Sequence, residues 1–272
     1  MKILLEMFEY TFMVRAIVVG LLISLCASLL GVSMVLKRYS MIGDGLSHVG
    51  FASLAIAAAC NIAPLKLAIP VSIAAAFLLL RLNASSRIKG DAAVAIVCSG
   101  ALAIGVMVIS LSSGMNTDVN NYMFGSILSL SREDTILSII LSLLVLILFV
   151  LFYPRIFAVT FDENFAKATG TRAGLYNTVL AVMTAITVVI GMRMMGALLI
   201  SSLIIFPALT SMRVMKTYRS VVICSVITAV CCFMVGICLS FVLSVPTGAS
   251  IVCVDLVLFL VFSAFSAIRR KK

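Results

Sequence analysis

The chain has 272 residues, of which 63% are hydrophobic and 11% are charged, and its mean hydropathy is +1.27. Soluble domains carry about a quarter of their residues as charged side chains, so this composition excludes a soluble enzyme or a soluble binding domain. A net charge of +10 would suggest nucleic acid in a soluble protein, but here the basic residues stand singly or in short clusters between apolar runs. That pattern sets membrane topology, so the expected partner is the lipid bilayer and not nucleic acid.

Runs of about 20 apolar residues, each long enough to cross a bilayer once as a helix, fill most of the chain. They predict an all-α, polytopic membrane helix bundle that forms one domain over residues 1–272. The candidate spans are residues 14–36, 44–62, 64–82, 91–111, 134–153, 174–191, 194–212, 219–243 and 249–268. The pair 174–191 and 194–212 is short and closely joined. If one of the two is a half-helix, the chain crosses eight times instead of nine.

Lysine and arginine predict the orientation, because loops on the cytoplasmic side retain them. With nine spans, fifteen of the twenty basic residues fall on the side of the C-terminus and five fall on the other side. We therefore expect a multi-pass protein of the cell (inner) membrane, with its N-terminus outside and its C-terminus in the cytoplasm. With eight spans, one end would change sides.

One hydrophilic stretch, Met41 to Phe51, interrupts the apolar runs near the start of the second span. Asp44 and His48 are four residues apart, so in a helix their side chains lie on one face, one turn apart, with Ser47 beside them. An ionisable group in a bilayer costs about 2.5 to 3.5 kcal/mol on insertion scales. An imidazole and a carboxylate supply two ligands for zinc, manganese or iron. We therefore interpret Asp44 and His48 as a metal transit site, with Ser47 as a candidate pathway residue.

A simpler interpretation of the same stretch is also open. Asp44 could cap the helix behind Gly43, and His48 could hydrogen-bond a neighbouring span. This alternative weakens because the only histidine of the chain falls on the same helical face as Asp44. A site with only two protein ligands suits an ion in transit and not a structural ion. We expect no permanently bound cofactor, and a divalent metal ion as the transported substrate.

Two loops are long enough to do more than turn the chain. Residues 112–133 form an outer loop, which is a candidate docking or gating surface. Residues 154–174 form a cytoplasmic coupling loop, in which Asp162 and Glu163 come early and Gly170 ends the segment. Acidic residues at a helix start match the helix dipole, and glycine is a common helix stop. We expect a short cytoplasmic helix on which a soluble motor can push.

The last span contains Asp255, a second acid deep in an apolar run. It is a candidate pathway carboxylate, or it pairs with an arginine or a backbone group at a subunit contact. The eight cysteines all lie inside apolar runs, so we expect inert, unpaired thiols. No Gly-x-x-x-x-Gly-Lys-Ser/Thr motif occurs in the sequence. The energy for any ATP-driven step must therefore come from a partner.

Six ordered blocks of the sequence resemble a known family nearly from end to end. The first three are Leu36-Lys37-Arg38 with Gly43-Asp44-Gly45-Leu46-Ser47-His48, then Gly90-Asp91-Ala92-Ala93-Val94-Ala95-Ile96, then Phe124-Gly125-Ser126-Ile127-Leu128. The later three are the segments from Phe161 to Gly170, from Gly196 to Ala208 and from Pro246 to Ser250. In this order the blocks resemble the membrane permease of the ABC-3 class, which works in bacterial zinc, manganese and iron importers.

The resemblance implies an ATP-driven importer in which two copies of the permease form the channel as a homodimer. Two ATP-binding cassette subunits sit beneath the channel, and an extracellular or periplasmic metal-binding protein delivers the ion. By matched position, the family holds the metal at Asp44 and His48. The loop that contacts the ATPase matches the block that contains Asp162, Glu163, Phe165, Ala166 and Gly170.

The chain departs from the family pattern at Ser244, where an Asp is common, and at Asp255, where the family is usually apolar. These departures leave the outer gate and the ion preference open. One alternative function is a permease for a metal chelate such as cobalamin or a siderophore, but a wide cavity does not need a charged Asp/His face. An intramembrane enzyme is the other, and the sequence has none of the protease signatures. Asp plus His suits manganese, zinc and ferrous iron alike, so the pair does not select the metal.

Overall fold

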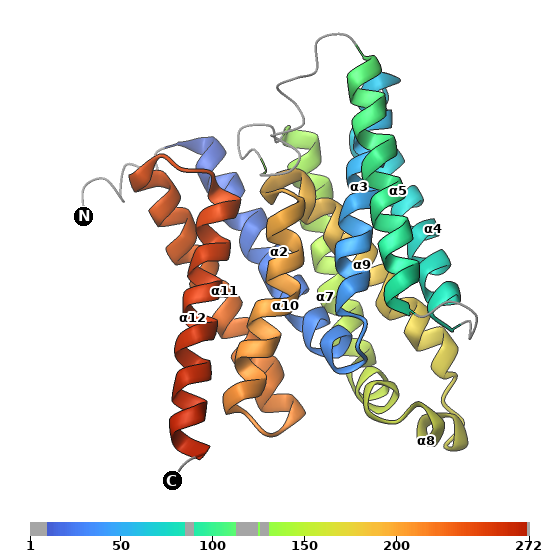
Figure 1. The fold of residues 1–272 in the computed structure, drawn as a ribbon, viewed down its shortest axis with the longest axis vertical. Helices are drawn as coiled ribbons and strands as arrows, with labels where there is room; N and C mark the ends of the chain where they lie inside the picture. Colours follow the sequence, from blue (N-terminus) through green and yellow to red (C-terminus); the bar gives the residue numbers. More distant parts are fainter. Residues whose placement is uncertain (1–9, 85–89, 113–124, 126–130, 271–272) are drawn as a thin grey trace.

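The structure is a computed structural model that describes residues 10–84, 90–112, 125 and 131–270 (Figure 1). Within these residues every regular element is an α-helix, which confirms the all-α prediction. The long helices are α2 (Thr11–Leu36), α3 (Ser40–Ala59), α4 (Pro64–Ala84), α5 (Gly90–Leu111), α7 (Arg132–Phe161), α9 (Ala173–Met195), α10 (Ala197–Val214), α11 (Tyr218–Leu243) and α12 (Thr247–Arg270). One short helix, α8 (Glu163–Ala168), lies between α7 and α9.

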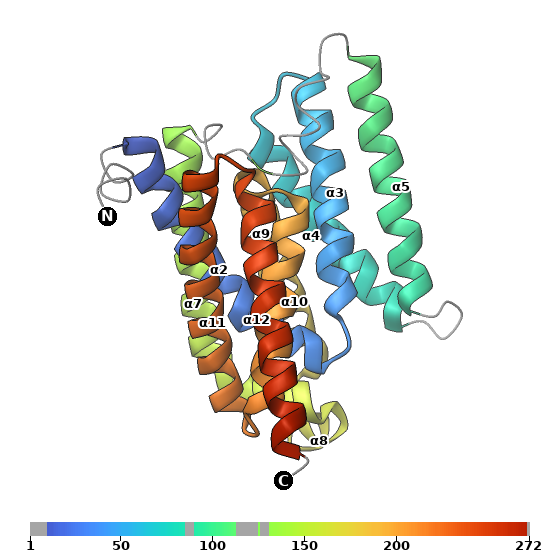
Figure 2. The same cartoon turned by 60° about the vertical axis from the view of Figure 1, so that its left-hand side comes forward.

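Eight of the described helices are long and apolar enough to cross a bilayer, and α10 is a shorter apolar helix. The 18 residues of α10 rise about 27 Å, close to the roughly 30 Å thickness of the hydrocarbon core. Figures 1 and 2 show α10 running alongside α9 and back to the end of the bundle where α8 lies. The eight helices and α10 therefore make nine passes through the described bundle. The first turn of α2 and the last turn of α12 consequently lie at opposite ends of it.

The turn between α9 and α10 is a single residue. Gly196 has φ +86° and ψ 161°, a backbone conformation that is essentially restricted to glycine. Its N–H donates to the carbonyl of Met192 at 2.8 Å. α9 ends at Met195, slightly beyond the end of the predicted span 174–191. A glycine at this position lets α10 begin directly after α9 ends and run back alongside it, with no loop between the two helices.

α7 differs from the sequence-based expectation at its C-terminal end. The helix continues through Pro154 to Phe161, whereas the cytoplasmic loop was expected to begin at residue 154. A proline removes one hydrogen bond inside a helix, but the helix does not end there. The 30 residues of α7 rise about 45 Å, which is longer than the hydrocarbon core of roughly 30 Å. The last turns of α7 therefore extend beyond the apolar layer and carry α8 with them.

The opposite end of the bundle carries a partly buried ion pair. Arg193 of α9 and Asp134 of α7 form two nitrogen–oxygen contacts of 2.8 Å, and both side chains are 15% exposed. The predicted outer loop, residues 112–133, lies largely outside the described residues. Of its described residues, Gly125 packs against the backbone of Met195 at the end of α9. The described contacts at this end therefore fix α9 against α7.

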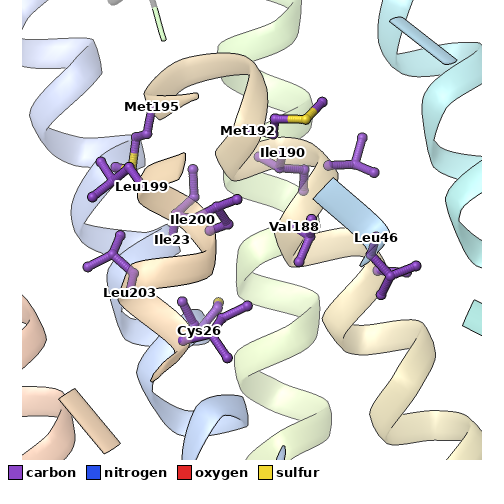
Figure 3. Packing of buried hydrophobic residues seen from close by; sticks show 14 of the residues in the cluster. Ile23, Cys26, Leu46, Val188, Ile190, Met192, Met195, Leu199, Ile200 and Leu203 are labelled. Atoms are coloured by element: carbon purple, nitrogen blue, oxygen red, sulfur yellow. The ribbon is translucent and has the colours of Figure 1, made fainter. Parts of the chain in front are cut away.

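The core of the bundle lies between α2, α3, α9 and α10. In the most apolar stretch of α2, α3 and α9, 72% of residues are buried, whereas the corresponding value for α12 is 11%. Figure 3 shows buried side chains from all four central helices, among them Ile23 of α2, Leu46 of α3, Val188 of α9 and Ile200 of α10. Because lipid tails are as apolar as leucine, helices in a bilayer associate through close packing. α12 instead turns most of its apolar side chains outward, as a lipid-facing helix does.

A small residue sets the closest approach of α2 and α10. A Cβ atom built on Gly31 of α2 would lie 2.0 Å from the backbone carbonyl oxygen of Ile204 on α10. Unlike a flexible side chain, neither helix backbone can move aside to make room for that Cβ atom. By contrast, a Cβ on Gly100 of α5 would meet no atom within 4 Å.

We predict that Gly31→Ala lowers stability by about 1 to 3 kcal/mol, the usual cost of overpacking a core. Gly100→Ala is the matched control, because it adds the same methyl group to a helix in open space and should be neutral or stabilise by about 0.5 to 1 kcal/mol. Thermal unfolding of the two variants in detergent measures the difference. Equal melting temperatures would contradict a close approach of α2 and α10 at Gly31.

Candidate functional site

The candidate metal residues lie in the first half of α3. This helix begins at Ser40, and its N-cap residue, Tyr39, makes no side-chain capping bond. Asp44 is therefore one turn inside the helix. The alternative interpretation in which Asp44 caps the helix is wrong, because the Asp44 carboxylate is not at the helix start.

Asp44 and His48 face each other across one helical turn, as their spacing predicts. His48 Nε2 lies 3.9 Å from Asp44 Oδ2, and the two side chains are 24% and 37% exposed, respectively. The other carboxylate oxygen, Asp44 Oδ1, accepts a hydrogen bond from Ser201 Oγ of α10 at 3.1 Å. One oxygen of Asp44 is thus oriented by α10, while the other points toward the imidazole. Both side chains are still open enough to meet an ion.

A third ligating side chain joins them from α5. Asp44, His48 and Cys98 each offer one ligand atom, and these atoms all lie within 4.8 Å of one another. The thiol of Cys98 also faces the backbone of α3, because a Cβ built on Gly45 would lie 3.7 Å from Cys98 Sγ. All eight cysteines were expected to be inert. For Cys98 the structure shows a different environment, and no local spacing links residue 98 to residues 44 and 48.

The two candidate pathway residues are not brought into this cluster. Ser47 is fully buried, and its hydroxyl donates to the backbone carbonyl of Asp44 at 2.7 Å. Asp255 lies on α12, where it is 1% exposed. Neither of its carboxylate oxygens has a hydrogen-bond partner among the described residues. The thiol of Cys232 on α11 lies against it, and none of the ion pairs in the described part of the chain includes it.

The predicted cytoplasmic helix is present as α8, at the same end of the bundle as the C-terminal end of α12 (Figures 1 and 2). Asp162 caps it, because Asp162 Oδ1 accepts a hydrogen bond from the N–H of Phe165 at 2.9 Å. Gly170 follows the helix with φ +83°. Ala166 is fully buried in a small apolar cluster, whereas Phe165 is 65% exposed. α8 is therefore anchored on one side and presents an aromatic ring on the other.

Glu163 connects α8 to the rest of the bundle. Its Oε1 lies 2.8 Å from Lys167 Nζ. Its Oε2 accepts a hydrogen bond from Asn177 Nδ2 of α9 at 3.0 Å and lies 3.7 Å from Lys37 Nζ. The bond from Lys167, together with Asn177 and the charge of Lys37, holds the pKa of Glu163 below its ordinary value, against the opposing effect of partial burial.

Lys37 is the centre of this polar network. It lies between α2 and α3, and its side chain is 6% exposed. Its ammonium group donates to the carbonyl of Val159 on α7 at 3.1 Å and also to Asn177 Oδ1. Burial lowers the pKa of Lys37. One ammonium group thus joins α7, α8 and α9 to the segment that leads into α3, which carries Asp44.

Comparison with known proteins gives a consistent result. A model of the ABC 3 transport family matches residues 9–266. The probable iron transport system membrane protein of Haemophilus influenzae is 28% identical, covering 98% of each chain. The manganese import system permease protein ScaB of Streptococcus gordonii is 27% identical, covering 93% of this chain and 91% of its own. The high-affinity zinc uptake system membrane protein ZnuB of Haemophilus influenzae is 28% identical, covering 93% of this chain and 96% of its own.

A solved structure agrees with these matches. PsaBC from Streptococcus pneumoniae in complex with Fab contains a chain that superposes with a TM-score of 0.86 at 25% identity, covering 96% of this chain and 94% of that one. The family match spans nearly the whole sequence, and the named relatives are transport proteins. This chain therefore belongs to the ABC 3 transport family, as a membrane-embedded transport subunit and not as an enzyme.

Proposed function

We propose that this chain is the membrane-spanning permease subunit of an ATP-driven importer, and that a divalent metal ion passes through it by way of Asp44 and His48. The observation that carries the proposal is the pairing of a carboxylate and an imidazole on one face of a central membrane helix, 3.9 Å apart. Related proteins are named for iron, manganese and zinc transport. The ligand atoms lie within 4.8 Å of one another, a size that suits a single ion better than a chelate.

The site is suited to passing an ion on. Ser201 holds one oxygen of Asp44, and a second residue that orients a ligand in this way raises the affinity of metal sites. His48 and Asp44 are nevertheless partly exposed, so water can complete the coordination shell and exchange with it. A closed shell of protein ligands is typical of structural sites, whereas an open position is typical of sites at which ligands exchange. An ion held here can be released.

The two ends of the bundle support a proposed orientation and proposed partners. The basic residues predict that the end carrying α8 faces the cytoplasm, where an ATP-binding cassette subunit would contact α8 through Phe165. A binding protein outside the cell membrane would deliver the ion at the opposite end. A second copy of the permease, related by a two-fold axis, would complete the channel as a homodimer. Disulfide trapping between equivalent positions of two copies, in the assembled complex, tests the homodimer.

We predict that Asp44→Ala and His48→Ala each abolish metal uptake, because either change removes a ligand from the pair. Ser47→Ala is the matched control on the same helical turn, since its hydroxyl is already used within α3, and it should transport at a rate near that of the wild type. Radiometal uptake by cells that express the permease with its partner subunits measures all three variants. Normal uptake in Asp44→Ala or His48→Ala, with protein inserted at normal levels, would refute the transit site.

We also predict that Glu163→Gln lowers the amount of metal transported per ATP hydrolysed several-fold and leaves ion affinity unchanged. The change removes the charge that links α8 to Lys37 at 3.7 Å. Glu133→Gln, which alters an exposed acid at the start of α7, is the control. Uptake and ATP hydrolysis are measured together in vesicles that contain the assembled complex.

The double variant Lys37→Gln/Glu163→Gln separates coupling from stability. Glu163→Gln leaves a buried ammonium group without its carboxylate, which is destabilising in itself. The double variant has no such unpaired charge, so its stability should recover while its coupling stays low. Recovery of coupling in the double variant would show that Glu163 only stabilises the fold.

A further inference from the structure

Cys98 is the ligating side chain of the cluster that neither the helical spacing nor the named relatives assign. It lies on α5, and its sulfur, with one atom each of Asp44 and His48, forms a group in which all separations are below 4.8 Å. α3 and α5 pack along most of their length in both views (Figures 1 and 2), and Cys98 Sγ faces α3 at Gly45. The sulfur is therefore positioned by a helix contact and not by a flexible loop.

We propose that Cys98 is a third protein ligand of the transit site, and that its sulfur makes the permease prefer thiophilic divalent cations such as zinc over manganese. The inference rests on the proposed function, because it concerns the same ion pathway. Thiolate ligands favour zinc, whereas manganese is suited to carboxylate, carbonyl and water oxygens. Asp44 and His48 alone accept either ion, so the third ligand decides between them.

The geometry fits a zinc-sized ion after a small contraction. Zinc binds sulfur at about 2.3 Å and nitrogen or oxygen at about 2.0 to 2.2 Å, so two of its tetrahedral ligands lie roughly 3.3 to 3.7 Å apart. His48 Nε2 and Asp44 Oδ2 lie 3.9 Å apart, slightly beyond that range. The three ligand atoms are within 4.8 Å of one another, so the longest separation needs to close by at most about 1.1 to 1.5 Å. Three protein ligands leave the fourth position open for water, which matches the zinc sites where ligands exchange.

Binding through sulfur also has a defined proton balance. The thiol of Cys98 gives its proton to solvent when it coordinates the ion, and the ion replaces that proton on the sulfur. No oxidant or reductant takes part. Release of the ion reverses the exchange, with sulfur taking a proton back from water.

Chemical protection of the thiol tests the proposal without relying on transport. In membranes that contain the assembled complex, N-ethylmaleimide alkylates free thiols, and mass spectrometry of the peptides reports each cysteine separately. Zinc or cadmium should slow alkylation of Cys98 at least tenfold, and manganese at the same concentration should slow it far less. Cys60 at the end of α3 is exposed and serves as the internal control, because its rate should not change. Equal protection of both cysteines, or no protection of Cys98, would overturn the proposal.

Variants at Cys98 test the selectivity itself. We expect Cys98→Ser to lower the ratio of zinc uptake to manganese uptake about tenfold or more, since even the loss of a residue that only supports a ligand costs metal sites about 10- to 100-fold in affinity. Cys98→Asp, which replaces sulfur with a carboxylate, should move the ratio further toward manganese. Cys253→Ser on α12 removes an exposed cysteine outside the cluster and should leave the ratio unchanged.

The outcomes separate this inference from the proposed function. If Asp44→Ala and His48→Ala abolish uptake but Cys98→Ser and Cys98→Asp leave the metal ratio as in the wild type, the transit site stands and the role of Cys98 is refuted. If Asp44→Ala transports normally, the transit site itself is refuted, and the role of Cys98 fails with it.

Discussion

An ionisable side chain inside a bilayer needs partners, and the arrangement of the central helices meets that requirement around Asp44. On insertion scales the charge costs about 2.5 to 3.5 kcal/mol at the centre of a membrane helix. The helix that carries it is among the most buried of the described bundle, although the Asp44 side chain itself is 37% exposed. Ser201 of α10 donates to one oxygen, and His48 faces the other. The packing of α3 against α5, α9 and α10 is therefore what makes a polar site tolerable at this place.

The two acids of the membrane helices show how much those partners matter. Asp44 has a hydrogen-bond donor, an imidazole and partial exposure. Asp255 is almost fully buried, and both of its oxygens lack a hydrogen-bond partner within the described residues. The sequence already distinguishes them, because Asp44 lies in the hydrophilic stretch from Met41 to Phe51 with His48 one turn away, whereas Asp255 stands alone in an apolar run. The neighbouring helices add to that difference, because they leave the Asp44 side chain partly exposed and bury Asp255 almost completely.

The sequence predicted the features that have local signals, and it missed those that depend on contacts between helices distant in sequence. The helices follow from apolar runs, the Asp44/His48 pair follows from the 3.6-residue period, and α8 follows from its cap and its charges. These are local signals, and the structure agrees with them. Cys98, Ser201 and Lys37 join the site or the α8 network through contacts between helices that are distant in sequence, and no local pattern encodes such contacts. Pro154 shows the reverse case, because a local signal for a break was overridden and α7 continued to Phe161.

The single-residue turn at Gly196 joins α9 to α10 without a flexible loop, and so connects two distant parts of the molecule rigidly. α9 starts near the α8 network through Asn177, and its 23 residues give a rod about 35 Å long. At its far end, α10 begins after one residue and reaches Ser201, which bonds Asp44. A displacement of α9 along its axis would therefore carry Ser201 with it and withdraw or restore a donor at the carboxylate. α9 and the start of α10 therefore form a stiff connection between the α8 network and Asp44, and glycines inserted beside Gly196 would make that connection flexible.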